Sequence, residues 1–243
     1  MSRVLWQKLL MPDLSAPPAT LRDEPYKDEV TNTRAYEKPS AEIAIPDPKA
    51  FRSMSRASIF LAHIVQDAKD ALAPYQAKTP FSVGVYCAVE NGPIDGPSTA
   101  KILAQPDPEN FAEHYRKFRN PKMYLKQLPN LAPAQTGIFM DLRGPLNVYT
   151  HSLAGAWHAL DQAEWDLESG VVDAALVCTA HAFDDFLVVK RARRVDPRCL
   201  TEGAAALLLV KDGGRTDWTS RVELDPRNFF GISDPLINLL RRS

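Results

Sequence analysis

Three long apolar runs alternate with amphipathic or small-residue segments along the chain. They are FSVGVYCAVENG at 81–92, VVDAALVCTA at 171–180 and GAAALLLVK at 203–211. Apolar runs of this length are typical of strands that are buried on both faces of a sheet. A shorter β-branched and aromatic run, NVYT at 147–150, predicts a further strand just before a sharp turn.

The intervening segments have helical periodicity. Residues 55–72 place apolar side chains on one face, and residues 109–118 form a short helix. The segment 180–194 is predicted to be a helix or an irregular excursion from the sheet. The helix predicted over 152–169 has a face of small residues, and Gly170 terminates it; that face comprises Gly155, Ala156, Ala159, Ala163 and Leu167. The strand–helix–strand order predicts an α/β fold with a largely buried sheet.

Prolines cluster near the N-terminus. The chain has 20 prolines and 11 glycines, and residues 12–50 are rich in prolines and charges. Helices and central strands tolerate proline poorly. We therefore expect a Pro-rich extended arm over residues 1–46, with a disordered tail as an equal alternative, and a folded domain over 47–243.

Composition narrows the class of protein. The formal net charge is -1, so the chain lacks the excess of basic residues that is typical of nucleic-acid-binding proteins. Three cysteines do not make a disulfide framework, and Cys87 and Cys178 fall inside apolar runs, as small buried hydrophobes do. The first apolar run is broken by Gln7 and Lys8, unlike a signal peptide. These features predict a cytoplasmic protein without a membrane span.

Ser152 lies at the turn where a nucleophile is often mounted. The G-x-S-x-G motif fails because its first glycine is missing. A serine needs a base; His151 is adjacent and points away, His158 is two helical turns on, and His114 or His181 come near only through folding. Local chemistry favours a helix N-cap for Ser152. No metal-ligand spacing or phosphate loop is present, so we expect no metal and no cofactor.

Several stretches together resemble the β-ketoacyl-acyl-carrier-protein synthase family, of thiolase fold. The segment from Thr150 to Gly155, with a Gly-Pro pair in front at 144–145, is similar to the family's nucleophile block. EGAAALLLVK at 202–211 resembles its Glu-Gly-Ala strand. QLPNLAPAQTGI at 127–138 and FRSMSRAS at 51–58 are similar to its Pro-Asn stretch and its early Met-Ser-Arg helix start. These matches follow the family's order over residues 50–211.

The resemblance implies a single thiolase-like half, with a βαβαβ core and a mostly buried mixed sheet flanked by helices. It places Ser152 where the family has its catalytic cysteine. The family's two catalytic histidines come from a second half, which we expect this chain to lack. A half-fold would expose the small-residue face of the helix at 152–169, and the tail PLINLL at 235–240 would cover part of it.

The same family includes inactive homologues, called chain-length factors, that pair with an active ketosynthase. By resemblance, the pairing strand here comprises Leu146, Asn147, Val148, Tyr149 and Thr150. The loop 120–128 would carry tunnel-facing Met123, Tyr124 and Leu128, for which ordinary core packing is the alternative.

Our hypothesis is a non-condensing, chain-length-factor-like subunit that pairs with a full-length β-ketoacyl synthase and works with an acyl-carrier protein, in polyketide, aryl-polyene or fatty-acid-like biosynthesis. One alternative is a serine-dependent acyl-transfer enzyme acting through Ser152. Another is a non-catalytic carrier-binding module using the basic run at 190–194.

Overall fold

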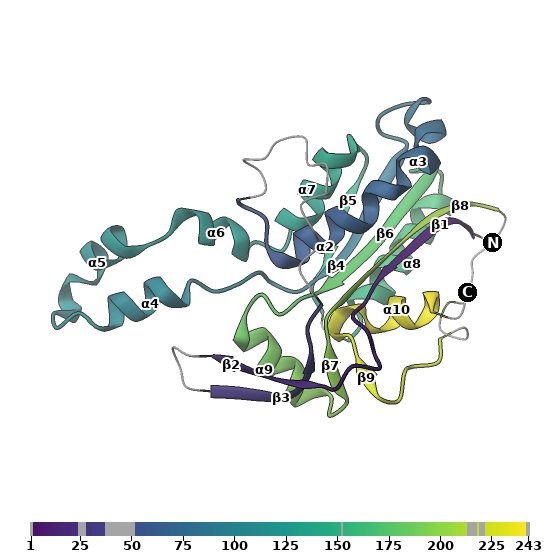
Figure 1. The fold of residues 1–243 in the computed structure, drawn as a ribbon. Helices are drawn as coiled ribbons and strands as arrows, with labels where there is room; N and C mark the ends of the chain where they lie inside the picture. Colours follow the sequence, from purple (N-terminus) through teal and green to yellow (C-terminus); the bar gives the residue numbers. More distant parts are fainter. Residues whose placement is uncertain are drawn as a thin grey trace.

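A five-stranded mixed sheet forms the centre of the computed structural model, which describes residues 2–23, 28–36, 52–151, 153–212, 218 and 222–241. The strand order is β1-β8-β6-β4-β5. β4 is parallel to β5 and β6, whereas β8 is antiparallel to β6 and β1 (Figure 1). The strands are β1 (Ser2–Leu10), β4 (Val83–Val89), β5 (Leu146–Tyr149), β6 (Ala174–His181) and β8 (Gly203–Lys211).

The three central strands are those that the apolar runs predicted. Every residue of β4 and β6 is buried, and only Lys211 of β8 is exposed. Cys87 and Cys178 lie opposite each other on β4 and β6, and both are free and buried. Burial raises the pKa of the Cys87 thiol, and so does the neighbouring Cys178. The interpretation of both as small buried hydrophobes is confirmed.

Helices cover both faces of this sheet. One face packs against α2, α3 and α7, and the other against α8 and α10. The helix predicted over 55–72 is confirmed, with a short 3-10 turn, η1 (Gln66–Ala68), between its two parts. Ser55 caps its start by accepting the N–H of Ser58 at 3.1 Å. The helices are α2 (Arg56–Val65), α3 (Lys69–Gln76), α7 (Leu131–Met140), α8 (Gly155–Glu168) and α10 (Asp234–Leu240).

The small-residue face of α8 is buried, so the expectation that a half-fold would expose it is wrong. Ala156, Ala159 and Ala163 are each at most 1% exposed and pack against β4 and β6. The C-terminal tail packs beside α8 in the same hydrophobic cluster, and every residue of η4 (Gly231–Ser233) and α10 is buried. At Gly155 a side chain would meet Ile232 Cδ1 at 2.9 Å. The expected covering role of the tail is confirmed.

The N-terminal residues are extended and paired where the structure describes them. β1 completes one edge of the central sheet. β2 (Ala19–Asp23) and β3 (Asp28–Arg34) form an antiparallel pair in a second sheet of order β2-β3-β7-β9, beside α9 (Phe186–Val195). β7 is Cys199–Thr201 and β9 is Asn228–Phe229. Residues 37–46 of the predicted arm lie outside the described residues.

Three short helices leave the body as a narrow extension (Figure 1). We call residues 96–127 the projection. It comprises α4 (Gly96–Leu103), η2 (Pro108–Asn110), α5 (Phe111–Phe118) and α6 (Pro121–Gln127). The predicted short helix near 109–118 is α5.

A buried carboxylate ties the two sheets to α2. Glu202 is 0% exposed and lies between β7 and β8. Arg56 donates to its two oxygens from Nε and Nη2, both at 2.7 Å, and the N–H groups of Tyr36 and Phe183 donate at 2.7 and 2.5 Å. Four donors thus compensate the burial of this charge.

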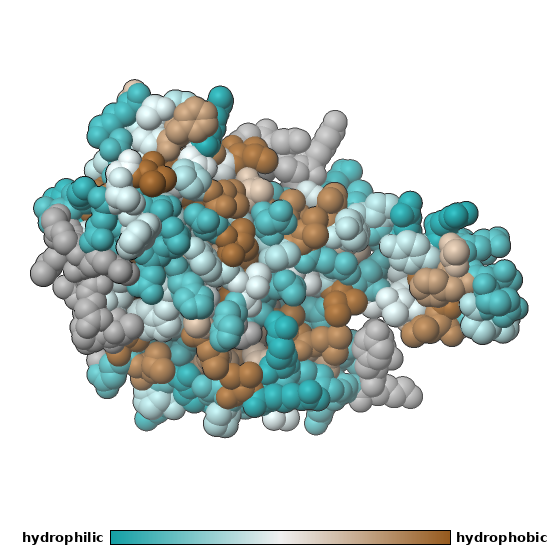
Figure 2. Space-filling view, turned by 180° about the vertical axis from the view of Figure 1, so that it is seen from behind, coloured by the Kyte–Doolittle hydropathy of each residue, from teal (hydrophilic) through white to brown (hydrophobic). Residues whose placement is uncertain are grey.

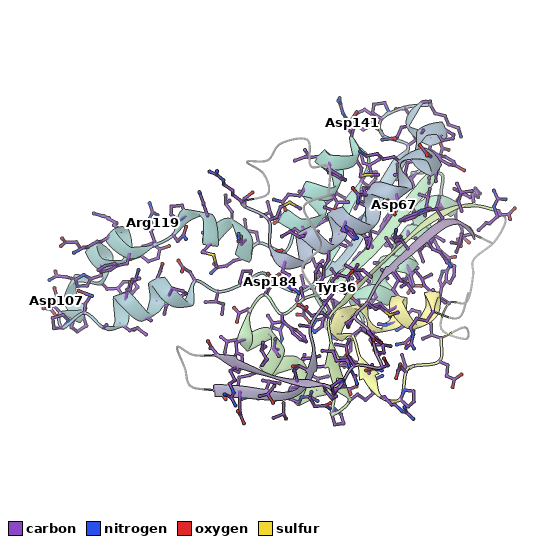
Figure 3. The ribbon with its side chains drawn as sticks, in the orientation of Figure 1. Tyr36, Asp67, Asp107, Arg119, Asp141 and Asp184 are labelled. Carbon is purple, nitrogen blue, oxygen red and sulfur yellow. The ribbon has the colours of Figure 1, made fainter. Side chains whose placement is uncertain are left out.

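Asp184 reinforces the same junction. Its carboxylate accepts the N–H groups of Arg56 and Ala57 at 2.6 and 2.9 Å, at the N-terminus of α2. A carboxylate is favoured at that position because the first N–H groups of a helix lack internal partners. Burial raises the pKa of Asp184. Figure 3 shows Tyr36 and Asp184 near the start of α2.

We predict that Glu202→Gln lowers the free energy of unfolding by about 3 kcal/mol. The neutral amide leaves the Arg56 guanidinium without its counter-charge, and the NH₂ group of the glutamine would face groups that are themselves hydrogen-bond donors. Urea denaturation measures the change. Lys78→Gln, which breaks the exposed Lys78–Asp173 pair, is the matched control and should cost less than about 1 kcal/mol. Equal effects of the two substitutions would contradict the structural role of Glu202.

Candidate functional site

The parallel strands β4, β5 and β6 end at one edge of the sheet, where α8 begins. Their last residues are Val89, Tyr149 and His181. Sites in α/β folds form at the carboxyl ends of parallel strands, because the loops that follow them converge there. We therefore take the turn between β5 and α8, residues 150–154, as the candidate site.

His151 organises the described part of this turn. Its Nδ1 accepts the N–H groups of Leu153 and Ala154 at 3.4 and 3.2 Å, and its carbonyl accepts the N–H of Gly155 at 2.7 Å. The helix begins at Gly155 with Ala154 as its N-cap residue, three residues later than predicted. Ser152 itself, with its predicted nucleophile and capping roles, lies outside the described residues.

The histidines that folding might have brought to this turn have other surroundings. His114 lies on the projection, where its Nε2 is 2.9 Å from Asp107 Oδ1. His181 is completely buried, and neither ring nitrogen has a hydrogen-bond partner. Its ring packs against Gly231, where φ is 52° and an added Cβ would lie 2.2 Å from Nδ1. Burial, followed by the positive charge of Arg191, lowers the pKa of His181 to about 4.

His158 lies closer to the turn than its sequence separation indicated. Its ring centroid is 6.4 Å from that of His151 and 6.1 Å from that of Tyr149. Because His151 lies before the first residue of α8, no helical spacing in the sequence indicated this contact. A shallow groove of about 350 Å³ runs along this face, lined by Tyr149, His158, Asp161, Gln162 and Trp165.

A hydrogen-bonded cluster of Tyr86, Asp166 and Gln162 lies at this groove, which Gln162 lines. Tyr86 Oη donates to Asp166 at 2.6 Å, and Gln162 Nε2 donates to the same carboxylate at 2.9 Å. Burial and the Asp166 charge raise the pKa of Tyr149. Neither Tyr86 nor Asp166 belongs to a recognised sequence motif, so neither was predicted to lie at this site.

The predicted pairing strand is the free edge of the central sheet. Within the described chain β5 pairs with β4 alone. The Pro145 carbonyl accepts the N–H of Val85 at 2.8 Å, and main-chain groups alternate in direction along a strand. The N–H groups of Leu146 and Val148 therefore point away from β4. Leu146 is 40% exposed, and Thr150 is exposed after the strand ends.

The predicted tunnel-facing residues lie on α6 rather than in a loop. None of the residues of α6 is buried, and Tyr124 is 59% exposed. Met123 is half-buried, and Leu128 is the C-cap residue of the helix with 38% exposure. Ordinary core packing within this chain therefore does not describe Tyr124 and Leu128, which are exposed, and stays an alternative for Met123.

The basic run at 190–194 is mostly engaged within the protein. Lys190 pairs with Asp28, and Arg191 pairs with Glu90. Arg193 donates to main-chain carbonyls of residues 31, 32 and 196–198. This run binds α9 to β3 and to the loops around it, which weakens the case for a carrier-binding surface there.

The part of the chain that the structure describes contains no group of three or more His, Cys, Asp or Glu side chains that could hold a metal ion. None of its helices is both long and apolar enough to cross a membrane.

Comparison with solved structures identifies the fold as that of one thiolase-like half of a ketosynthase. A β-ketoacyl synthase from Burkholderia phymatum is similar over 82% of this chain, with 18% identity and a TM-score of 0.59. A ketosynthase in complex with its chain length factor from Xenorhabdus doucetiae is similar over 88%, with 11% identity and a TM-score of 0.60. A type II polyketide ketosynthase in complex with its acyl-carrier protein has 16% identity over 74% of the chain and a TM-score of 0.61.

The chain spans about half the length of these structures, 53%, 58% and 53% respectively. No protein-family model and no curated protein matches the sequence. The mixed α/β fold and the thiolase-like half that the motifs indicated are confirmed.

We predict that stability falls between pH 6.5 and pH 4 through His181. Its pKa is lower in the folded than in the unfolded chain, so unfolding takes up a proton in this range and is favoured as the pH falls. The loss at pH 4 is at most about 3 kcal/mol. Urea midpoints measured against pH should fall less steeply for His181→Leu than for the unmodified protein. Parallel pH profiles would contradict the assignment.

Proposed function

We propose that the protein is a non-condensing, ketosynthase-like subunit that pairs with a β-ketoacyl synthase and helps to set the length of its product. The observation that carries this proposal is the free β5 edge of a ketosynthase-like sheet. An edge strand with unpaired main-chain groups is a template for pairing with another chain. Leu146 and Val148 present such groups, and β5 carries no charged side chain.

Two of the similar structures are complexes of the proposed kind. One is a ketosynthase in complex with its chain length factor, and another is the ishigamide ketosynthase/chain length factor. For this chain, the two complexes support the proposed pairing with a ketosynthase.

A silent nucleophile position is consistent with this role. Ser152 replaces the cysteine of the family motif, and a serine hydroxyl without a base is essentially un-ionised at neutral pH. Nδ1 of His151 faces the main-chain N–H groups of the turn, His114 pairs with Asp107, and His181 is enclosed. Of these three histidines, two are engaged in hydrogen bonds and one is enclosed, which supports the proposed silent position.

The exposure of residues on and next to α6 supports a length-setting role. Tyr124 and Leu128 are exposed, and Met123 is half-buried. In this proposal, a partner that pairs with β5 also contacts α6, which is connected to that strand through α7. Bulky side chains at this position would shorten the cavity that the partner offers to a growing acyl chain.

We predict that Leu146→Pro weakens pairing with the ketosynthase at least 10-fold, since it removes an outward N–H while leaving the β4 ladder intact. Native mass spectrometry of the complex from its own host identifies the partner, and titration of the purified subunits gives Kd. Leu146→Val, which keeps the N–H and an apolar side chain, should bind within about 2-fold of the unmodified protein. Unchanged binding by Leu146→Pro, or a host preparation without a ketosynthase, would overturn the pairing proposal.

We predict that Tyr124→Ala shifts the reconstituted system toward longer products, because the smaller side chain deepens the acyl cavity, whereas Ser152→Ala leaves yield and length unchanged. Chromatography with mass detection measures both. Loss of product in Ser152→Ala would favour the serine-dependent acyl-transfer alternative. An unchanged product distribution in Tyr124→Ala would remove the length-setting role.

A further inference from the structure

The projection is attached firmly to the body at its base. The N–H of Gly92 donates to the Gln127 carbonyl at 3.3 Å, and a Cβ at Gly92 would lie only 1.5 Å from the Lys126 carbonyl oxygen. Asp185 accepts the N–H of Ile94 at 2.5 Å. The body thus holds both ends of the projection, through main-chain contacts that only glycine permits at position 92.

One aspartate joins the two legs of the projection, by which we mean α4 on one side and the returning helices α5 and α6 on the other. Asp95 caps α4 by accepting the N–H of Ser98 at 3.2 Å, and its other oxygen accepts the N–H of Asn120 at 3.1 Å. Asn120 in turn caps α6 by accepting the N–H of Lys122 at 3.1 Å. These hydrogen bonds join the start of α4 to the start of α6 at the base of the projection.

Beyond this base the helices bury very little. No residue of α5 or α6 is buried, and Leu103 and Phe111 are 77% and 57% exposed. Figure 2 shows hydrophobic side chains gathered on this extension. A groove of about 710 Å³ runs between the legs, and its apolar walls include Ile102, Leu103, Phe111, Tyr115, Tyr124 and Leu125. Exposed apolar surface of this kind marks an interaction site.

The charge on the projection is unbalanced. It carries six cations and three carboxylates, and within the described chain none of the six makes an ion pair. The cations are Lys101, Arg116, Lys117, Arg119, Lys122 and Lys126. Arg119 lies in the groove lining, whereas Asp107 is occupied by His114 and Asn110 at the far end (Figure 3). This contrasts with the basic run of α9, whose charges are largely paired.

The projection is continuous with the β5 edge. α6 leads into α7, which packs against β5, and a Cβ at Gly137 of α7 would lie 3.9 Å from Leu146 Cδ1. α7 therefore links the projection to the strand at which the proposed partner would add.

We infer that the groove of the projection binds an amphipathic helix of the partner subunit, with an apolar face between α4 and α5 and acidic side chains against the free cations. A helix laid in a groove buries its apolar stripe against the two walls. This inference rests on the proposed pairing and adds a second, electrostatic contact to it. The contact also stabilises the projection, because isolated helices of seven or eight residues are marginal in water.

Two substitutions test the groove. Arg119→Glu and Leu103→Asp change exposed side chains, and each should raise Kd for the ketosynthase at least 10-fold. The matched controls are Arg194→Glu, an exposed cation on α9, and Val171→Asp, a 55% exposed apolar residue after α8. Both controls should bind within about 2-fold. Binding of the unmodified protein should also weaken with added salt, and Arg119→Glu should reduce that dependence.

Hydrogen exchange of the full chain, free and in complex, gives an independent measurement. Main-chain amides of residues 111–127 should exchange rapidly in the free protein and become protected when the ketosynthase is added. Equal exchange in both states would overturn the inference, as would unchanged binding by both groove variants while Leu146→Pro still weakens it.

Two other occupants have distinct outcomes. If the groove variants lose affinity for an acidic acyl-carrier protein and keep their affinity for the ketosynthase, the groove is a carrier site and the inference is wrong. If native mass spectrometry shows a homodimer that Leu103→Asp dissociates, the occupant is a second copy of this chain. Failure of the proposed function is distinguishable from both, since it requires that the unmodified chain does not bind a ketosynthase at all.

Discussion

The buried carboxylate of Glu202 is the interaction on which the arrangement of the two sheets depends. It joins the segment after β3, the start of α2 and the loop after β6 at one point, through Tyr36, Arg56 and Phe183. A buried charge is costly unless every lone pair has a donor, and here the four donors come from three separate parts of the chain. These segments must therefore be in place together. Arg56 and Glu202 also come from two of the ketosynthase-like motifs, so the resemblance at the level of motifs corresponds to one physical contact.

Much of the central architecture was predictable from the sequence, because burial on both faces produces apolar runs that cannot be confused with loops. This was so for β4, β6 and β8, and for α2 and α8, whose periodicity is strong. β1 was not predicted, since its side chains alternate between exposed and half-buried and Gln7 and Lys8 interrupt the apolar run. The burial of the α8 face was also missed. That face packs against β4 and β6, and the C-terminal tail packs beside it; such long-range contacts cannot be inferred from local periodicity.

The candidate site was predictable in position more than in chemistry. The turn after β5 and the edge location of residues 146–149 follow from the motif and from the order of the strands. The surroundings of the histidines do not, because each depends on tertiary contacts. His181 is enclosed by Gly231, which lies 50 residues away in sequence, and the nearness of His158 to His151 follows from how the turn at 151–154 enters α8. The paired state of Lys190 and Arg191 likewise required partners from β3 and from the end of β4.

The two edges of the central sheet differ in a way that limits the size of any assembly. β1 carries Arg3 and Lys8, and its register with β8 shifts between Val4 and Trp6. An irregular, charged edge resists the addition of a further strand, whereas β5 has neither feature. If both edges accepted strands, successive molecules would add head to tail and form open fibres. With β1 closed in this way, the proposed association through β5 would be self-terminating, and the sheet would stop extending after one partner had joined.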